Sequence, residues 1–408
     1  ATAVGLPGAD PTELALCFGA SDGAVVLDPA KVAGKIVVCD RGGNVLVNKV
    51  ANARAAGAVG VIIQNVSAAA DTTPLISAVL PTVHLPLSAF AAVTTEASLP
   101  NGTASFSGGV QTAGVVAPVM SNSSSRGPNQ ADADMLKPDI TAPGTDIIAA
   151  FANRALTQAQ RDAIASGNLA AATPYYEMIS GTSMSSPHIA GMGALLKQAN
   201  PTWSPYAIKS ALMTSASQNV KLANGSPDPS PWGYGAGHAN PNAALQTQVV
   251  YDTTNADHLA YYNRALPGGG SSLNVASMTR GNAVGATTFT RTLTNKGSTP
   301  VTLNATASLA GFTVAVSPAQ LTLAPGASQS YTVTATPTTA PANVYVFGNV
   351  TWTDGATQNL RSPLTVRYSQ FTGVASITDT RAVGTRVWTV ATGFSGPMQV
   401  TPTGMVPA

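Results

Sequence analysis

The sequence contains few charged residues, and they do not cluster. Charged side chains make up 9% of the 408 residues, and the formal net charge is +2. No run of Lys or Arg occurs, so there is no electrostatic basis for binding nucleic acid. Long apolar runs are also missing, since a stretch such as 58–63 is far shorter than the roughly 20 residues of a membrane-spanning helix. We therefore expect neither nucleic acid nor a membrane among the partners of this chain.

Cysteine is nearly absent as well. Cys17 and Cys39 are the only two. One disulfide would suit an oxidising compartment, while two buried thiols are an alternative that the sequence leaves open. Low charge with abundant Ser, Thr, Asn, Gly and Pro favours a secreted, β-rich protein. The first residues, from Ala1, show neither an initiator Met nor a basic segment followed by an apolar one, so we expect an internal piece of a longer, processed chain.

Three patterns follow one another along the chain. Residues 14–110 alternate β-type runs with helical spacing, which predicts a small α+β or open-barrel unit. Its predicted helix is 45–56, and its predicted strands are 24–27, 35–39, 59–64 and 82–85. From about 113 to 250 the pattern is strand, loop and helix, typical of a buried sheet covered by helices. Here we predict strands at 145–151 and 175–179 and helices at 183–198 and 204–215.

The third pattern begins after a Gly-rich stretch at 267–272. Residues 273–368 alternate short strands of Val, Thr and Leu with turns, and this even spacing predicts an antiparallel β-sandwich. Residues 369–408 continue in the same style, so we expect a further β-domain or a tail there.

The strongest chemical signal is the run ISGTSMSSPH at residues 179–188. A predicted strand enters it, Gly181 permits a sharp turn, and a predicted helix leaves it, which places Ser183 at the N-terminus of the helix. Free backbone N–H groups and the helix dipole favour negative charge there. This suits the nucleophile of an acyl transfer, because the attacked carbonyl becomes an anion. An isolated Gly-Thr-Ser would more simply contain an N-cap serine, but the ten-residue context favours the nucleophile.

This run resembles the serine motif of the subtilases, the subtilisin-like serine proteases. The resemblance implies that Ser183 is the nucleophile, that its backbone N–H lines part of the oxyanion hole, and that the Thr182 hydroxyl supports the oxyanion. Small residues at 191, 193 and 194 are expected to pack the helix closely inside the core. Five further segments resemble the plant-type, cucumisin-like members: SSRGPN (124–129), LKPDITAPG (136–144), PTWSP (201–205), IKSALMT (208–214) and YGAGH (234–238).

The resemblance also implies a domain organisation. GKIVVCDRG (34–42) and AAGAVGV (55–61) resemble the protease-associated domain inserted into such catalytic domains, and the predicted sandwich resembles their fibronectin type III-like domain. The expected fold is α/β: the C-terminal part of a subtilisin-like parallel-sheet domain, an inserted α+β domain and a C-terminal β-sandwich. The expected divisions are 1–13 (end of a first catalytic segment), 14–112 (protease-associated domain), 113–266 (C-terminal part of the catalytic domain), 273–368 (fibronectin type III-like domain) and 369–408 (further β-domain or tail). A Cys17–Cys39 disulfide is expected to tie the early segment of the inserted domain to its central strand.

The motifs that supply a subtilase with its Asp, its His and its oxyanion Asn do not occur in the sequence. In the family they precede the inserted domain, and Asn168, in the polar insertion 152–173, is interpreted as a loop residue. We therefore expect a serine endopeptidase acting on protein or peptide substrates, with an N-terminal part of the same protease supplying Asp and His. The alternative is a catalytically inert fragment that binds proteins. No cofactor is expected in the chemistry, while the resemblance allows structural calcium and a homodimer.

The four histidines do not fit the role of the missing base. His188 follows Ser183 by five residues, and five helical steps turn a side chain away by about 140°. His84 falls in the predicted inserted domain, His238 in a Gly-rich turn and His258 in a polar stretch. We interpret all four as structural residues.

Other polar positions are also interpreted as structural. Asp139 follows Pro138 ahead of a predicted strand, and we expect it to accept hydrogen bonds that hold a loop rather than to act in catalysis. Asp132 and Asp134 lack the spacing of a calcium-binding loop. The segment 41–43 lacks the Lys-Ser/Thr pair that follows a phosphate-binding loop.

Overall fold

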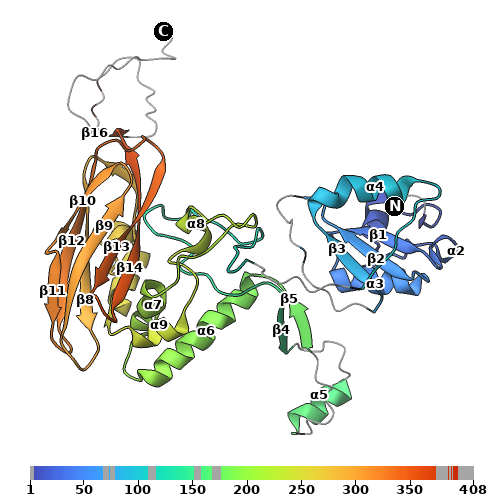
Figure 1. The fold of residues 1–408 in the computed structure, drawn as a ribbon, viewed down its shortest axis with the longest axis horizontal. Coiled ribbons are helices and arrows are strands. Elements are labelled where there is room, and N and C mark those ends of the chain that lie inside the picture. Colours follow the sequence, from blue (N-terminus) through green and yellow to red (C-terminus); the bar gives the residue numbers. More distant parts are fainter. Residues whose placement is uncertain are drawn as a thin grey trace. The chain divides into compact units, whose positions relative to one another are not determined.

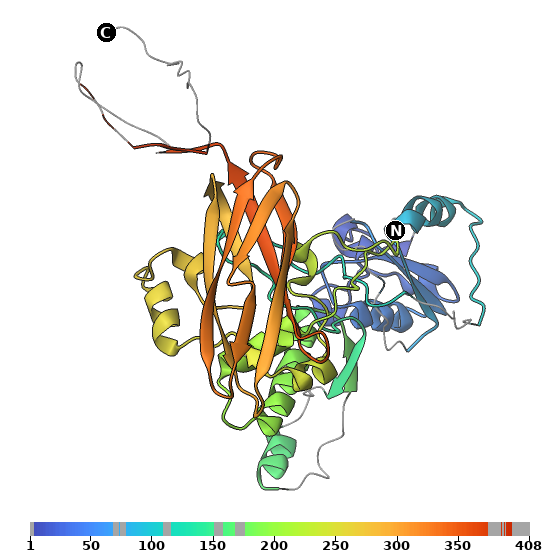
Figure 2. The same ribbon diagram turned by 60° about the vertical axis from the view of Figure 1, so that its left-hand side comes forward.

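The computed structural model describes residues 4–67, 73, 79–108, 116–150, 158–167, 176–373, 385, 387 and 389–393. The chain divides into two compact units (Figures 1 and 2). The first unit consists of Ala1–Ser124 and Pro143–Pro187, and the second unit consists of Ser125–Ala142 and His188–Ala408.

A three-stranded parallel sheet forms the centre of the first unit (Figure 1). Its strands lie in the order β1 (Ile36–Asp40), β2 (Gly60–Gln64) and β3 (Thr82–Leu85), and α3 (Leu46–Ala55) connects the first two. Both pairings are parallel. Since a parallel pair needs a crossover connection, the unit contains a β-α-β connection. The expectation of an α+β or open-barrel unit is therefore wrong for the strand directions of the described residues.

The predicted elements of this unit are confirmed with one exception. All five residues of β2 are buried, and its β-branched Val and Ile side chains suit a central strand. The predicted strand 24–27 is wrong, because Leu27 makes only a single bridge, to Gly5. The remaining short helices of the region are α1 (Pro11–Ala15), η2 (Ala20–Asp22), α2 (Pro29–Val32), η4 (Leu87–Ala89) and α4 (Phe90–Ser98).

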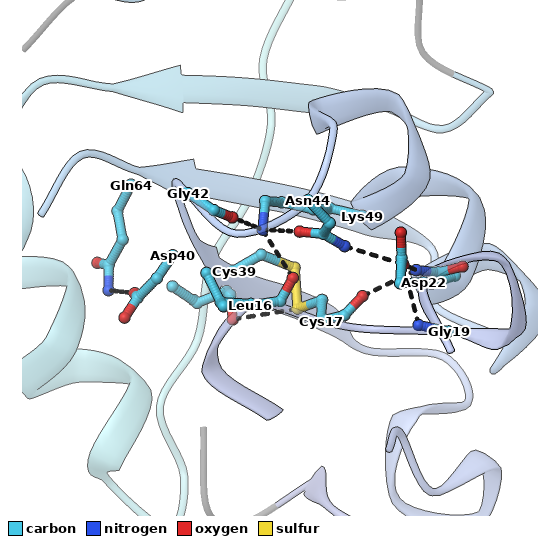
Figure 3. Close-up of a disulfide and its surroundings, with 12 residues drawn as sticks. Leu16, Cys17, Gly19, Asp22, Cys39, Asp40, Gly42, Asn44, Lys49 and Gln64 are labelled. Carbon is cyan, nitrogen blue, oxygen red and sulfur yellow. Dashed lines mark hydrogen bonds between the residues drawn. A yellow bond between two sulfur atoms is a disulfide. The ribbon is translucent and has the colours of Figure 1, made fainter. Parts of the chain in front are cut away.

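A disulfide joins Cys17 to Cys39 in β1, as predicted, with a Cα–Cα distance of 5.6 Å (Figure 3). Beside it, the Asp22 carboxylate accepts hydrogen bonds from three asparagine amides and from the Gly19 N–H. The asparagines are Asn44, Asn48 and Asn52. The early turn is thereby fixed covalently to β1 and by hydrogen bonds to α3.

The second segment of the first unit contains β4 (Ile147–Ala150), α5 (Gln158–Ala165) and β5 (Tyr176–Ile179). β4 and β5 form an antiparallel pair, and Ile148 in β4 is 65% exposed. The buried parallel sheet expected in the region 113–266 is therefore wrong for the described residues. A two-stranded ribbon without further strands leaves its faces uncovered, which accounts for the exposure.

The helix α6 (Thr182–Ala199) follows β5 and continues into the second unit. Among its described side chains only Leu196 is buried, and Leu195 is 53% exposed. A Cβ added at Gly191 would meet no atom within 4 Å. The expectation that small residues pack this helix closely inside the core is therefore wrong for positions 191 and 194, which are exposed, whereas Gly193 is half-buried and an added Cβ would lie 3.8 Å from Ile208.

The second unit continues with four helices, α7 (Pro205–Thr214), α8 (Pro231–Tyr234), α9 (Pro241–Gln246) and α10 (Asn255–Tyr262). The helix α7 begins as the sequence predicts. The Ser204 hydroxyl accepts the N–H of Ala207 at 3.0 Å, and Pro205 occupies the first helical position, where a missing N–H costs nothing. Leu196 of α6 packs with Ala207 and Ala211 of α7 in a small apolar core.

The predicted β-sandwich is confirmed (Figure 2), but one strand pair at the edge of its second sheet is parallel rather than antiparallel. One sheet has the order β10 (Phe312–Ser317), β12 (Ser328–Pro337), β8 (Thr287–Asn295) and β6 (Val249–Val250). The other has the order β11 (Gln320–Leu323), β9 (Val301–Leu309), β13 (Tyr345–Thr353), β14 (Asn359–Ser369) and β7 (Met278–Val284). The short 3-10 helix η6 (Gly269–Ser272) precedes the sandwich, and β15 (Phe371–Thr372) pairs with β16 (Ala391–Thr392) after it.

The sandwich and the helical part of the second unit share one core. Met213 of α7 and Tyr251, which follows β6, are buried in the same apolar cluster as Trp352 of β13. The Tyr251 hydroxyl lies 2.6 Å from that of Tyr331, whose ring meets Trp352 edge to face. The two parts therefore stabilise each other as one unit.

Candidate active site

Ser183 is the second residue of α6 and its side chain is exposed. Strand β5 ends at Ile179, and only Ser180 and Gly181 separate it from the helix. No hydrogen bond of the Ser183 hydroxyl occurs among the described residues. The predicted arrangement of strand, turn, serine and helix is thus present, with the hydroxyl open to attack an incoming group.

The backbone at the start of α6 presents hydrogen-bond donors. The N–H groups of Met184 and Ser185 are occupied by the Gly181 carbonyl, at 3.0 and 3.4 Å. Within the described part of the chain, the N–H groups of Thr182 and Ser183 have no acceptor. Such unoccupied donors at the positive end of an 18-residue helix favour an anion. Thr182, the second predicted site residue, is also exposed.

One loop of the first unit, which contains Gly144 and Asp146, holds the turn before Ser183. The Gly181 N–H donates to the Gly144 carbonyl at 2.7 Å. The Ser180 hydroxyl accepts the Asp146 N–H at 2.8 Å and donates to the Asp146 carboxylate at 3.1 Å. Asp146 has a left-handed φ of 55°, a conformation that Asp tolerates better than most side chains. The sequence reading missed this clamp, although Gly144 lies in one of the segments that carried the family resemblance.

The glycine that the turn requires is Gly144 rather than Gly181. A Cβ at Gly144 would lie 2.1 Å from the Ser185 hydroxyl oxygen and 2.8 Å from the Gly181 carbonyl oxygen. At Gly181 the nearest atoms would be 3.7 and 3.8 Å away, an ordinary contact, and its φ is not left-handed. Gly181 lies in the short turn, as the sequence predicts, but no contact requires glycine at this position, and the steric constraint lies on the facing loop at Gly144.

Three histidines have structural contacts. His84 in β3 shares a hydrogen bond of 2.7 Å with the side-chain amide oxygen of Asn65. The His238 backbone pairs with Ser217, and burial lowers the pKa of its imidazole. His258 stacks on Tyr206 with ring centroids 4.3 Å apart, and its pKa is lowered by burial and by nearby Lys209. Both imidazoles are therefore neutral near pH 7. His188, half-buried on α6, remains a structural residue only by prediction.

Asp139 binds two lysines. Its carboxylate lies 2.6 Å from the Lys137 ammonium and 2.9 Å from that of Lys209. Burial raises its pKa, but these two cations outweigh burial and lower the pKa overall. Its backbone carbonyl accepts the Ala236 N–H at 2.9 Å. These contacts hold loops of the second unit together, in line with the structural role predicted for Asp139.

The two aspartates at 132 and 134 are bound to protein groups. The Asp134 carboxylate pairs with Arg280 at 2.8 Å and accepts the Gly281 N–H. Asp132 accepts the Tyr261 hydroxyl at 2.7 Å. No cluster of three metal-ligating side chains is found in the described portion of the chain. Asn168, interpreted above as a loop residue, lies outside the described residues.

In the segment 41–43, Gly42 and Gly43 have left-handed φ values, and the Gly42 carbonyl accepts a hydrogen bond from Lys49. The segment therefore serves the internal packing of the first unit.

None of the helices described is long and apolar enough to span a bilayer.

Comparison with known families matches two parts of the chain. The profile of the subtilase family matches residues 20–251, and that of the fibronectin type-III domain matches residues 272–366. The first match contains the Ser183 turn and the clamp that holds it. The second covers most of the β-sandwich.

Among known proteins, two similar relatives come from Arabidopsis thaliana and one from Glycine max. Subtilisin-like protease SBT5.4 is 37% identical over 380 aligned positions, covering 84% of this chain and 46% of that protein. Subtilisin-like protease SBT1.7 is 36% identical over 371 positions, covering 81% and 47%. Subtilisin-like protease Glyma18g48580 of Glycine max is 32% identical over 388 positions, covering 84% and 48%. The chain thus spans about half the length of the curated relatives it matches.

Solved structures resemble only parts of the chain, and weakly. The secreted serine protease VesC from Vibrio cholerae covers 22% of this chain and 22% of its own, with a TM-score of 0.19 and 16% identity. A likeness of this size supports no argument.

Proposed function

The chain belongs to the subtilase family, and we propose that it supplies the nucleophile of a serine endopeptidase that cleaves protein or peptide substrates through an acyl-enzyme. The observation that carries this proposal is the exposed Ser183 hydroxyl in the first turn of α6, beside two unoccupied backbone N–H groups. The family resemblance of the surrounding run adds to it. The remaining machinery, a His and an Asp, would come from an N-terminal part of the same protease outside these 408 residues.

The proposed chemistry has two steps. The Ser183 oxygen attacks the substrate carbonyl while the His takes its proton, and the oxyanion accepts hydrogen bonds from the Ser183 N–H and from a further donor outside this chain. Collapse of this intermediate releases the amine, which takes the proton from the His. Water then attacks the acyl-enzyme in the same way and restores Ser183. The Thr182 hydroxyl would support the oxyanion from the preceding position. No cofactor enters these steps.

Without the His the chain should be nearly inert. In subtilisin, loss of the catalytic His alone lowers kcat by roughly 10⁶-fold. The second candidate function, a catalytically inert protein-binding fragment, would apply if the chain acted by itself. A groove of about 560 Å³ in the first unit, lined by Val38 and Ile62 of the sheet and Val93 of α4, favours this alternative for the N-terminal unit.

The roles of the regions outside the catalytic domain are proposed from the family resemblance. We propose that residues 14–112 form the protease-associated domain, with a role in substrate access or in pairing of subunits, and that residues 1–13 end a first catalytic segment. The parallel sheet and the disulfide of this region are compatible with an independent inserted domain. The disulfide and the low charge support secretion.

A fluorophosphonate probe tests the nucleophile. The chain is incubated with the probe alone and after co-expression with the N-terminal part of the protease. We expect labelling of Ser183 only in the assembled protein, and none in Ser183→Ala. Ser186→Ala, an exposed serine on the next turn, is the matched control and should label normally. Absence of labelling in the assembled protein, or labelling that survives Ser183→Ala, would exclude the proposal.

A further inference from the structure

The second unit has a surface hollow of about 660 Å³ at the C-terminal end of α10. Asp132, Tyr261, Tyr262, Arg264 and Leu266 line it. Sites for small ligands are typically 300–1,000 Å³ in volume and combine apolar walls with a few polar groups. The hollow has both the size and the composition of such a site, and none of its residues belongs to the site around Ser183.

Arg264 lies where a helix normally ends with glycine. The Ala265 N–H donates to the Ala260 carbonyl at 2.8 Å, and the Arg264 N–H donates to the Tyr261 carbonyl at 2.9 Å. This pair of bonds places Arg264 at the C′ position of a Schellman motif. Its φ is 56°, in the left-handed region that Gly occupies without strain and Arg does not. The chain therefore carries an arginine at a position where glycine would be more stable.

One acidic and one basic side chain line the hollow, and they differ in their hydrogen-bond partners. The Asp132 carboxylate already accepts the Tyr261 hydroxyl at 2.7 Å and the Asp134 N–H at 2.8 Å. Burial and Asp132 raise the pKa of Tyr261 to about 12, so its hydroxyl remains a donor at neutral pH. The Arg264 side chain is exposed and pairs with no acidic group of the described residues. The charged group that remains to bind a ligand is therefore the guanidinium of Arg264.

The remaining walls are apolar and accessible. Tyr262 is 81% exposed and Leu266 is half-buried. Tyr and Arg are among the residue types enriched where binding energy concentrates at protein interfaces. Its polar complement would be a planar anion, because a guanidinium binds a carboxylate through two parallel hydrogen bonds.

We propose that this hollow binds a peptide segment in which a carboxylate side chain adjoins an apolar one. The carboxylate pairs with Arg264, and the apolar side chain packs against the Tyr262 ring. The site is independent of the peptidase chemistry, because binding here needs no nucleophile.

Calorimetric titration of the purified chain with two probes tests the proposal. The probes are acetyl-Leu-Glu-amide and acetyl-Leu-Gln-amide, which differ only in the charge. We expect the Glu peptide to bind roughly tenfold more tightly, the difference made by one charge-assisted contact. Arg264→Gly should abolish this preference and also raise the melting temperature of the second unit by roughly 2–4 °C, because glycine relieves the left-handed strain.

Two further variants test whether the preference for the Glu peptide depends specifically on Arg264. Arg54→Gln, which removes an exposed cation at the end of α3, should leave the preference unchanged. Tyr262→Ala should weaken both peptides alike, because it removes the apolar wall and no charge. Equal affinity for the two peptides, no binding of either, or a preference that survives Arg264→Gly or is lost in Arg54→Gln would overturn the proposal.

Discussion

Each of the two units buries one cation on neutral oxygen atoms. In the first unit Lys49 is fully buried and donates to the Leu16 and Gly42 carbonyls and to the Asn44 side chain (Figure 3). In the second unit Arg291 is 1% exposed and donates to four backbone carbonyls. Burial lowers the pKa of Lys49 to about 8 and that of Arg291 to about 10. The chemistry of the two sites is therefore alike.

The residues that accept hydrogen bonds from Arg291 and Lys49 differ in burial. Two of the residues that accept from Arg291, Ser271 and Ser277, are buried, and both precede β8 in the connection to the sandwich. In contrast, Gly42 beside Lys49 is exposed and can turn its carbonyl to water. An unsatisfied polar group is costly only where water cannot reach it. The comparison predicts that the same kind of substitution will cost much more in the second unit.

Arg291→Met is expected to have the largest effect. It leaves buried carbonyls without donors, and the second unit should lose about 3–5 kcal/mol of unfolding free energy. Hydrogen exchange followed by mass spectrometry across a denaturant series reports each unit separately. A loss below about 1 kcal/mol would contradict the role assigned to this arginine.

Lys49→Met is expected to lower the unfolding free energy of the first unit by about 1–3 kcal/mol. The effect is smaller than for Arg291→Met because water can reach some of the three oxygen atoms that lose their donor. The same exchange experiment measures it, with the second unit as the internal reference. If this substitution proved as costly as Arg291→Met, burial of the acceptors would not be the property that distinguishes the two sites.

The segment around Ser183 has no buried cation and depends on the clamp between Gly144 and Gly181. In the full-length protease, Gly144→Ala should lower the rate of fluorophosphonate labelling roughly 10–100-fold, because its Cβ displaces the turn that positions Ser183. Gly181→Ala, the matched control, adds a Cβ in ordinary contact and should have a smaller effect. The opposite order of the two variants would show that the clamp does not set the position of Ser183.

The smallest expected effect is a pH dependence of the unfolding free energy of the first unit. The pKa of Lys49 is about 8 when folded, against an ordinary value of 10.5. Between these values the unfolded chain keeps a proton that the folded chain has lost, so unfolding binds a proton. Stability should then rise with pH between about pH 8 and pH 10, by at most about 1.4 kcal/mol per pH unit. The difference between wild type and Lys49→Met isolates this contribution, and a flat difference over that range would contradict it.

Local signals made the strand–turn–helix segment around Ser183 and the helix start at Ser204 predictable from sequence. The capping serine with Pro205 and the run around Ser183 each act within a few residues. The constraint at Gly144 was not predicted, because it arises from contact with a distant segment of the chain.

Packing and strand direction were harder to predict than element type. Gly191 was expected to lie in a core, but the structure places no atom near its missing Cβ, since burial depends on what covers the helix rather than on the helix itself. The sequence also predicted β1 and β2 correctly but not their parallel direction, which the connection through α3 sets. The burial of Arg291 and Lys49 had no sequence signal, because most of their acceptors are backbone carbonyls.

The central claim, that Ser183 becomes covalently acylated during peptide cleavage, can be tested by trapping that intermediate. The full-length protease is mixed with a slowly hydrolysed ester substrate, quenched in acid and digested, and the acylated peptide is sequenced by mass spectrometry. The account predicts that the acyl group lies on Ser183. Rapid turnover with the acyl group on another residue, or with no acyl-enzyme and an unmodified Ser183, would contradict it.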